Sequence, residues 1–322
     1  MIEARGLART FTGRRGTVEA VRGVDLSVAS GDVVGFLGPN GAGKTTTLRM
    51  LTTLLAPTAG TATVAGRDLR SDPAGVRRRI GYVAQGGGTD PSVPAAEELE
   101  LQARLYGVAD PAARIGELAR RLELDGEGLL ARPSAAMSGG QRRRLDLALG
   151  LVHRPRLLFL DEPTTGLDPQ SRGNLWEHIR GMRDRDGTTV FLTTHYLDEA
   201  DALCDRILII DRGRIVAEGS PAELKRRVSG DVVTLELAAS GEPLDQIAGK
   251  ARAALADHPS VREATVLDGA LRLTVDDGER ALMGLVRALD GAGVELAALR
   301  MARPTLDDVF LTVTGRSLRD AA

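Results

Sequence analysis

One stretch restricts the fold of this chain more than any other, the glycine-rich segment Gly38-Pro-Asn-Gly-Ala-Gly-Lys-Thr45. It directly follows the apolar run Val33 to Leu37 and precedes a helix-forming segment, Thr46 to Leu55. This strand–loop–helix order is the context of a phosphate-binding loop, because glycines let successive backbone N–H groups point inward at a helix N-terminus. Lys44 can then reach the β- and γ-phosphates, and the Thr45 hydroxyl can bind Mg²⁺. A glycine-rich turn with an incidental lysine is the alternative, but the flanking context favours a nucleoside triphosphate site.

Composition is that of a globular protein, and the charge distribution indicates a domain boundary. Apolar residues make up 43% of the 322-residue chain and charged residues 27%, as in ordinary globular proteins of one large or two ordinary domains. The net charge of -2 gives no support for nucleic acid as the main partner. Residues 230–322 hold 15 of the 44 acidic side chains but only 10 of the 42 basic ones. This change in charge balance predicts a domain boundary near residue 230.

The chain shows no sign of secretion or of membrane insertion. Cys204 is the only cysteine, so no internal disulfide is possible and a reducing compartment is expected. The N-terminus has no apolar segment of the secretory type, and no apolar run approaches the ~18 residues of a membrane span. We therefore expect that any work at a membrane requires docking on another protein.

Up to residue 229 the apolar patterns predict an α/β domain. Alternating or continuous apolar runs predict strands at 2–10, 18–28, 33–37, 61–64, 80–84, 156–160, 188–193, 206–210 and 214–217. Apolar residues at three- and four-residue spacing predict helices at 46–55, 97–105, 112–122, 140–151, 169–183 and 197–203. We expect a mostly parallel central sheet, an N-terminal antiparallel β region and a helical subdomain over about 90–152. The run Arg142-Arg143-Arg144 is expected on a solvated or partner-facing helix surface.

Residues 230–322 predict a second, smaller domain. Strands are expected at 232–237, 261–267, 271–275 and 294–301, with helices at 244–255 and 279–289. The resulting order β-α-β-β-α-β is that of a ferredoxin-like α+β domain. Asp268-Gly269 predicts a hairpin turn between the middle strands. A short amphipathic tail, Thr305 to Thr312, closes the domain.

Two acidic residues follow the predicted strand at 156–160. An acid at a strand end beside the loop strand is where Mg²⁺ needs a carboxylate, so Asp161 is a candidate metal ligand. The adjacent Glu162 is then placed to polarise an attacking water as a general base. Simple solvent exposure is the alternative interpretation of such a pair.

Three further positions carry polar groups that suit a phosphate site. Met137-Ser-Gly-Gly-Gln141 opens a predicted helix, where Ser138 can cap the helix and the glycines expose backbone N–H groups to an anion. Gln85 ends a strand, where its amide can reach a metal ion or water, and His195 follows a strand and can contact a γ-phosphate. Taken singly, a capped turn, a surface glutamine and a structural histidine are the simpler interpretations. The order and spacing of these stretches along the chain favour a functional role over these simpler interpretations.

Together these stretches resemble the ATP-binding cassette ATPases, from about residue 2 to about 225. By this resemblance Met137–Gln141 is the family signature, which normally begins with leucine, and Asp168 in Gly166-Leu-Asp168 matches the D-loop aspartate. Phe11, in a Gly/Arg-rich turn, occupies the place of the aromatic residue that stacks on adenine; a core residue at a strand end is the alternative. The resemblance implies catalytic roles for Glu162, His195 and Gln85 and Mg²⁺ ligation by Thr45, Gln85 and Asp161. The implied ATP contacts are Phe11, Gly38, Pro39, Asn40, Gly41, Ala42, Gly43, Lys44, Thr45, Thr46, Ser138, Gly139, Gly140, Gln141 and Asp168.

The resemblance also implies partners. In this family the signature of one cassette completes the nucleotide site of a second cassette, so a head-to-tail homodimer around two ATP molecules is implied. A separate polytopic membrane permease is the other implied partner, with the chain bound peripherally at the cytoplasmic face of the cell membrane. The segment Gln85 to Pro94 is expected to form the coupling surface.

A narrower resemblance points to one type of exporter. Four stretches are similar to the daunorubicin/doxorubicin-resistance ATPases: Thr89-Asp-Pro-Ser92, Leu101-Gln-Ala-Arg-Leu-Tyr-Gly107, Gln141-Arg-Arg-Arg-Leu-Asp-Leu147 and the tail Pro304 to Arg316. This implies ATP-driven efflux of a small amphipathic molecule. Export of a polysaccharide or lipid-linked glycan is the alternative within the same class. A soluble cassette acting on nucleic acid or ribosomes is the alternative of a different class, and the chain has no paired cassette, long insertion or basic arm to support it.

Overall fold

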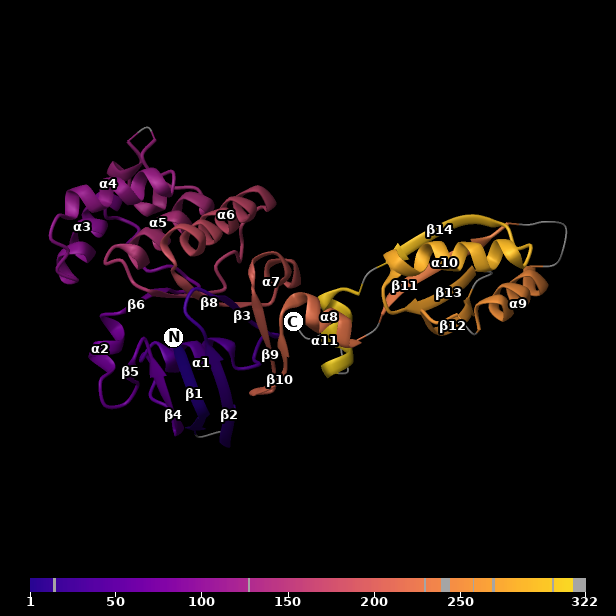
Figure 1. The fold of residues 1–322 in the computed structure, drawn as a ribbon. Helices are drawn as coiled ribbons and strands as arrows, with labels where there is room; N and C mark the ends of the chain where they lie inside the picture. Colours follow the sequence, from indigo (N-terminus) through magenta and orange to yellow (C-terminus); the bar gives the residue numbers. More distant parts are fainter. Residues whose placement is uncertain are drawn as a thin grey trace. The chain divides into compact units, whose positions relative to one another are not determined.

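The computed structural model describes residues 1–13, 16–126, 128–228, 230–238, 244–256, 258–267, 270–302 and 304–314. The chain forms two compact units, Met1–Pro221 and Ala222–Ser317 (Figure 1). The division lies shortly before the change in charge balance near residue 230, because helix α8 (Pro221–Val228) belongs mainly to the second unit.

A six-stranded sheet forms the centre of the first unit, in the order β10-β9-β3-β8-β7-β6. Its strands are β3 (Val33–Leu37), β6 (Ile80–Val83), β7 (Leu157–Asp161), β8 (Thr189–Thr194), β9 (Arg206–Asp211) and β10 (Arg214–Gly219). All neighbouring strands are parallel except β9 and β10, which form an antiparallel hairpin. Strands β3, β7 and β8 are buried at every position, as expected where both faces of a parallel sheet are covered. The prediction of a mostly parallel central sheet is confirmed.

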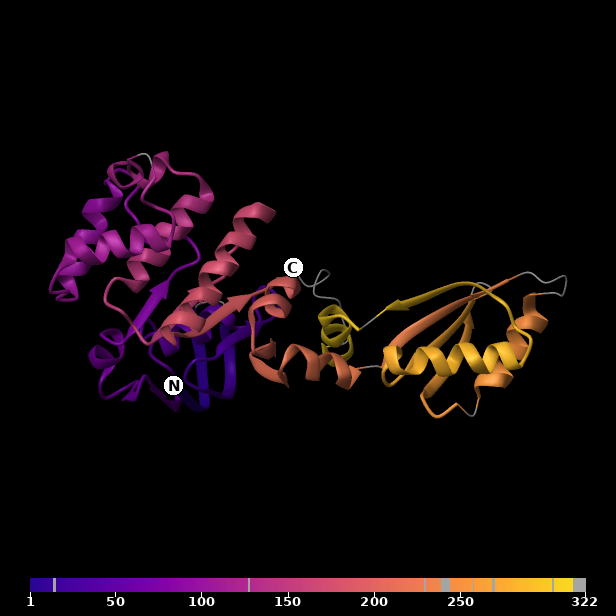
Figure 2. The same ribbon diagram turned by 45° about the horizontal axis from the view of Figure 1, so that its top comes forward.

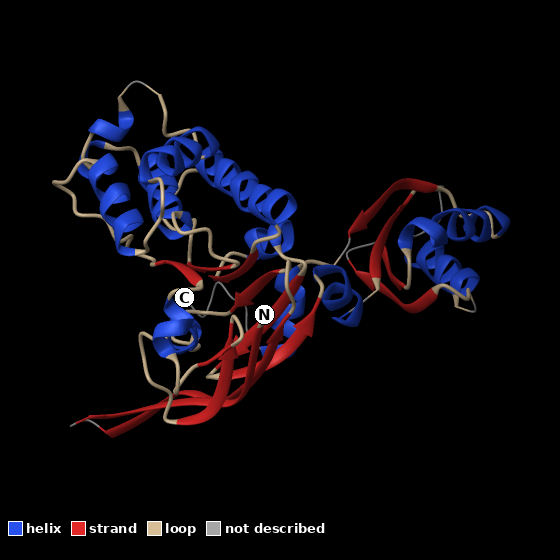
Figure 3. Ribbon diagram, turned by 60° about the vertical axis from the view of Figure 1, so that its left-hand side comes forward, coloured by secondary structure: helices blue, strands red, loops and turns tan. Residues whose placement is uncertain are grey.

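A four-stranded antiparallel sheet packs against this centre, in the order β2-β1-β4-β5. Its strands are β1 (Ile2–Gly13), β2 (Gly16–Val28), β4 (Ala59–Val64) and β5 (Arg67–Asp68). One apolar core joins the two sheets, with Ile2 and Leu7 of β1 in the same cluster as Phe36, Phe159 and Phe191 of the central strands. Figure 3 shows the strands of this unit in red, below the blue helices of the helical subdomain.

Helices surround the central sheet, and three of them form the helical subdomain. The helices around the sheet are α1 (Lys44–Leu51), α2 (Pro73–Arg77), α3 (Ala95–Leu105), α4 (Pro111–Arg121), α5 (Gly139–Leu151), α6 (Pro169–Asp186) and α7 (Leu197–Leu203), with short 3₁₀ turns at η1 (Leu129–Ala131) and η2 (Ser134–Ala136). The helical subdomain consists of α3, α4 and α5. Helices α3, α4 and α5 lie together, drawn in magenta, in both Figure 1 and Figure 2. The side chains of Asp110, Ser138 and Asp168 cap the N-termini of α4, α5 and α6.

Two helices end at least three residues away from the predicted position. Helix α1 ends at Leu51 instead of Leu55, because the Thr52 hydroxyl donates to the Leu48 carbonyl at 2.9 Å and Thr53 has a left-handed φ of 63°. Helix α6 continues three residues beyond the predicted Arg183 and ends at Gly187, whose φ of 63° closes the helix in the left-handed conformation.

The second unit contains a four-stranded antiparallel sheet in the order β12-β13-β11-β14. Its strands are β11 (Asp231–Leu237), β12 (Val261–Leu267), β13 (Ala270–Val275) and β14 (Leu296–Ala302), and its helices include α9 (Leu244–Leu255), α10 (Gly278–Gly291) and α11 (Leu306–Thr314). Alternate residues of β11 and β13 share an apolar core with α9 and α10. The ferredoxin-like assignment of this unit stays our interpretation, and the predicted Asp268-Gly269 turn lies outside the described residues. Helices α8 and α11 lie side by side in Figures 1 and 2.

Within the described part of the chain, none of the helices combines the length and the apolar character that crossing a bilayer requires.

Candidate functional site

The glycine-rich loop connects β3 to α1 and forms a cradle. Gly43 caps α1 with a left-handed φ of 108°, and a Cβ atom there would lie 2.6 Å from the Ala20 carbonyl oxygen. A Cβ atom on Gly38 would lie 2.3 Å from the Ile210 carbonyl oxygen, so only glycine fits at either position. A pocket of about 280 Å³ opens over this loop. Its lining is Ala20, Pro39, Asn40, Gly41, Gly43, Lys44, Thr45, Thr46, Gln85 and Glu162.

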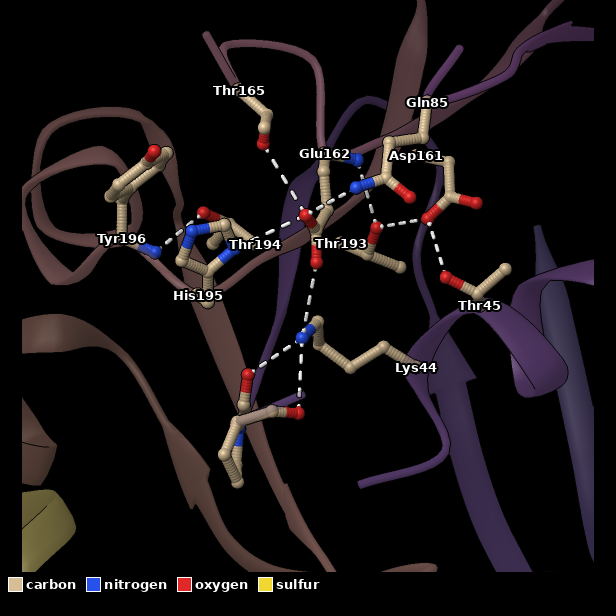
Figure 4. Close-up of polar contacts among 12 residues, drawn as sticks. Lys44, Thr45, Gln85, Asp161, Glu162, Thr165, Thr193, Thr194, His195 and Tyr196 are labelled. Atoms are coloured by element: carbon tan, nitrogen blue, oxygen red, sulfur yellow. Dashed lines mark hydrogen bonds and ion pairs between the residues drawn. The ribbon is translucent and has the colours of Figure 1, made fainter. Parts of the chain in front are cut away.

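Lys44 is buried in this cradle with its ammonium group fully engaged (Figure 4). Its Nζ donates to the carbonyl oxygens of Gly38 at 2.7 Å and Pro39 at 3.2 Å, and it lies 3.2 Å from Oε1 of Glu162. Burial lowers the pKa of the Lys44 ammonium, and the neighbouring Glu162 carboxylate opposes this effect only in part. The side chain therefore holds a cation at the floor of the pocket, where a phosphate group of a nucleotide would gain most from it.

Asp161, at the end of β7, lies beside the start of α1. Its Oδ1 accepts hydrogen bonds from the hydroxyl groups of Thr45 at 3.1 Å and Thr193 at 2.7 Å (Figure 4). A carboxylate and a hydroxyl oxygen at this distance fit Mg²⁺, which takes few protein ligands and completes its shell with water and phosphate oxygens. Across the described residues, no three His, Cys, Asp or Glu side chains cluster as a metal cage would require. The donor set therefore suits a nucleotide-bound ion and not a dedicated metal centre.

Glu162 occupies the middle of the site, with a left-handed φ of 46°. Its Oε2 accepts hydrogen bonds from Gln85 Nε2 at 2.9 Å and the Thr165 hydroxyl at 3.3 Å. The same oxygen lies 3.2 Å from His195 Nδ1, a close contact without hydrogen-bond alignment (Figure 4). Burial raises the pKa of the Glu162 carboxyl, but His195 and the charge of Lys44 together outweigh burial and bring it to about 2.

Ser138 and Gly140 start α5 at a different place from this pocket. Ser138 and Gln141 form a capping box, in which Gln141 N donates to Ser138 Oγ at 3.2 Å and Ser138 N donates to Gln141 Oε1 at 2.9 Å. Ser138 and Gly139 are exposed, whereas Gly140 is buried against α6. A Cβ atom on Gly140 would lie 2.9 Å from Ser171 Oγ. The described lining of the pocket over the glycine-rich loop includes none of the residues from Ser138 to Gln141.

Asp168 and Phe11 also lie apart from that lining. Asp168 caps α6 by accepting from Ser171 N at 2.9 Å and Ser171 Oγ at 2.6 Å, and these bonds lower the pKa of its carboxyl. Phe11 lies in β1 opposite Val18 and not in a turn, since the strand continues to Gly13. Its ring is 39% exposed beneath the Arg9 guanidinium, 4.7 Å from the ring centroid, so it is not a core residue.

Three polar residues near the site were not identified as site residues from the sequence. The Thr193 hydroxyl lies 3.0 Å from Glu162 N as well as bonding Asp161, and its place at a strand end beside His195 was the available signal. Arg143 is only 7% exposed, so the prediction that the 142–144 run lies on a solvated surface is wrong for its middle residue. Glu199 on α7 is fully buried and accepts from Trp176 Nε1 at 3.2 Å, and burial raises the pKa of its carboxyl.

Comparison with known proteins places these features in a family. Residues 21–165 match the family model described as ABC transporter, and residues 219–314 match the model described as ATP-binding protein DrrA1-3-like, C-terminal domain. The chain is 45% identical over 314 residues to the daunorubicin resistance ATP-binding protein DrrA3 of Streptomyces coeruleorubidus, covering 96% of each chain. It is 44% identical to the daunorubicin/doxorubicin resistance ATP-binding protein DrrA of Streptomyces peucetius, covering 99% of this chain and 94% of that one.

A solved structure supports the same placement. The post-hydrolysis dimer of the ATP-binding cassette MJ0796 bound to ADP and Pi is similar with a TM-score of 0.64 and 25% identity, covering 68% of this chain and 98% of that one. With curated relatives above 40% identity along almost its whole length, the chain belongs to the ABC transporter family of ATP-binding proteins and is an ATP-hydrolysing member of it.

Proposed function

We propose that the chain is the ATPase subunit of an exporter for small amphipathic molecules and that Glu162 is its general base. The observation that carries this proposal is the meeting of Lys44, Gln85 and His195 on one buried carboxylate. A carboxylate in this position can accept a proton from a water that attacks a γ-phosphate. Gln85 and Thr165 already donate to it and are suited to orient such a water.

Lys44 and His195 also explain how the base becomes active. Lys44 and His195 hold the pKa of Glu162 at about 2, which makes the carboxylate a weak proton acceptor. A triphosphate in the cradle offers the Lys44 ammonium and the His195 ring phosphate oxygens in place of the carboxylate. As they turn to the phosphates, burial of Glu162 becomes the stronger influence and raises its pKa toward the range useful for catalysis.

Thr45 and Asp161 would hold Mg²⁺, with Gln85 as a further oxygen ligand. The ion would supply charge neutralisation at the β- and γ-phosphates. The remaining contributions come from the chain itself: loop N–H groups bind the phosphates and Lys44 places a positive charge on them.

We further infer that two copies of the chain enclose two nucleotides. Ser138 and Gly139 are exposed at the N-terminus of α5, where backbone N–H groups favour an anion, yet they do not line the pocket of their own chain among the described residues. A two-fold dimer would bring them to the phosphate of the partner. The related cassette bound to ADP and Pi is itself a dimer, which supports this arrangement.

A groove of about 630 Å³ is the proposed docking place for a membrane permease, and the segment Gln85 to Pro94 forms part of its edge. Acidic side chains gather along it, namely Asp90, Glu97, Glu98 and Asp146, and Leu101 on α3 is 60% exposed beside them. A basic segment with apolar anchors complements such a surface. Docking there would hold the chain peripherally at the cytoplasmic face of the membrane.

The names of the relatives, which concern daunorubicin and doxorubicin resistance, support a small amphipathic cargo. We assign the ATPase to residues 1–229 and an accessory role to residues 230–322. The test uses a host strain from which the gene has been deleted, with doxorubicin fluorescence as the measure of accumulation. The wild-type chain should lower accumulation and Glu162→Gln should not, whereas exposed Glu177→Gln serves as a matched control. Failure of cross-linked membranes to yield any polytopic partner would contradict the exporter assignment.

A further inference from the structure

Arg143, on α5, is a buried guanidinium that bonds to backbone carbonyl groups on two loops of the catalytic site. Its Nη1 donates to Ala84 O at 2.7 Å and its Nε donates to Pro163 O at 2.7 Å. Its Nη2 donates to Asp161 O at 3.2 Å and, more weakly, to Glu162 O at 3.4 Å. One side chain therefore joins the residue before Gln85 to the backbone that carries the proposed base.

Only arginine suits this position. The guanidinium is planar, and its donors point in fixed directions, so it can span carbonyl groups on separate segments. A lysine ammonium has the same charge at a single nitrogen atom and cannot reach the end of β6 and the loop after β7 together. The geometry at Arg143 therefore depends on the shape of the side chain and not only on its charge.

Asp146 extends the connection toward the groove. It lies one helical turn beyond Arg143, with its Oδ2 3.5 Å from Arg143 Nη1. Its Oδ1 accepts from Gly88 N at 3.3 Å, and a Cβ atom on Gly87 would lie 3.1 Å from both carboxylate oxygens. Gly87 also has a left-handed φ of 77°, so the backbone fits closely around this carboxylate. Asp146 is part of the groove lining, whereas Arg143 lies behind it.

We propose that Arg143 and Asp146 form a positioning pair that transmits movement of the Gln85–Pro94 segment to the backbone of Glu162. The inference rests on the proposed function, since it assigns the groove to a permease. A segment that docks in the groove can contact the exposed Gly88 backbone, whose N–H donates to Asp146. Because Asp146 is paired with Arg143, and Arg143 holds the carbonyls of Asp161 to Pro163, a shift at the groove changes the position of the base. Neither side chain takes part in the chemistry.

The first test is Arg143→Lys in the purified full-length protein, with Arg142→Lys as the matched control. Arg142 is the exposed neighbour on the same helix, and its Nε donates to Ser134 O at 3.2 Å and to none of the four carbonyl groups that Arg143 bonds. We expect Arg143→Lys to lower kcat at least tenfold while the Kd for a fluorescent ATP analogue stays within twofold. The control should keep both values within twofold. A kcat for Arg143→Lys within twofold of wild type would overturn the proposal.

The second test separates positioning from a merely structural role and does not depend on the folding of the Arg143 variant. It is a double-mutant cycle on kcat with Asp146→Asn and Gln85→Ala. If the pair acts through the Gln85 segment, the combined loss is at least threefold smaller than the product of the single losses. The cycle of Arg142→Lys with Gln85→Ala should be multiplicative. If the kcat losses of Asp146→Asn and Gln85→Ala simply multiply, the proposal is overturned, because two substitutions that destabilise the protein independently give that result. Absence of hydrolysis by the wild type, or normal hydrolysis by Glu162→Gln, would instead count against the proposed function.

Discussion

Replacing Glu162 with glutamine tests the charge balance of the site and the chemistry together. The pKa of this carboxyl is about 2 against an ordinary value of 4.5, because Lys44 and His195 outweigh the effect of burial. That difference corresponds to about 3 kcal/mol in favour of the charged form. The variant keeps the shape of the side chain and removes the charge, so it should lose about this amount of stability at pH 7.

The pH dependence of this loss follows from the direction of the pKa change. The pKa of Glu162 is lower in the folded chain, so its contribution is fully present above about pH 4.5 and is lost as the pH falls to about 2. Urea unfolding without nucleotide, measured from pH 7 to pH 3, should show the stability difference between the two proteins falling to roughly half by pH 3. At pH 7 the variant should melt roughly 6–12 °C lower, at 2–4 °C per kcal/mol for a unit of this size.

The kinetic effect of Glu162→Gln is expected to be larger. Loss of a general base lowers the rate by about 10²–10⁴-fold, while Lys44 remains free to bind phosphate. Phosphate release should therefore nearly stop, and light scattering should detect an ATP-trapped dimer. Glu177→Gln, an exposed change on α6, is the control. Hydrolysis at the wild-type rate would refute the general-base assignment, and an unchanged melting temperature would refute the ion-pair reasoning.

Substitutions at three further positions test neighbouring parts of the site. Lys44→Ala should abolish binding of a fluorescent ATP analogue, because the buried positive charge in the glycine-rich cradle is lost. Retained binding would contradict the role of Lys44 in holding the phosphates. Ser138→Ala should cost about 1 kcal/mol as a lost helix cap and should also prevent the ATP-trapped dimer in the Glu162→Gln background; stability loss without a dimer defect would argue against the shared site. Glu199→Gln should keep the melting temperature and the fluorescence of Trp176, the only tryptophan, because its raised pKa favours the neutral form. Glu199→Leu should shift the emission, and equal spectra for the two variants would contradict the contact.

Much of the fold was predictable because the signals are local. The continuous apolar runs of β3 and β7 identify buried strands, and the bounds of α7 agree with the prediction. The burial of Arg143 was not predictable, since α5 is buried on most sides and its apolar spacing does not single out one outward face. The early end of α1 depends on the Thr52 hydroxyl, whose bond to Leu48 O competes with continuation of the helix.

The sequence by itself determined the chemistry of each segment: glycines at the two positions where a Cβ atom would strike a neighbouring carbonyl, a lysine after them, and acids at the end of a buried strand. These properties depend on residues close together in the chain. Only the tertiary structure decided which of the segments meet. The sheet order β3-β8-β7-β6 brings the ends of four strands side by side, so Lys44, His195, Glu162 and Gln85 converge although more than a hundred residues separate some of them. Strand pairing over such distances follows from packing of the whole core, which no local pattern specifies.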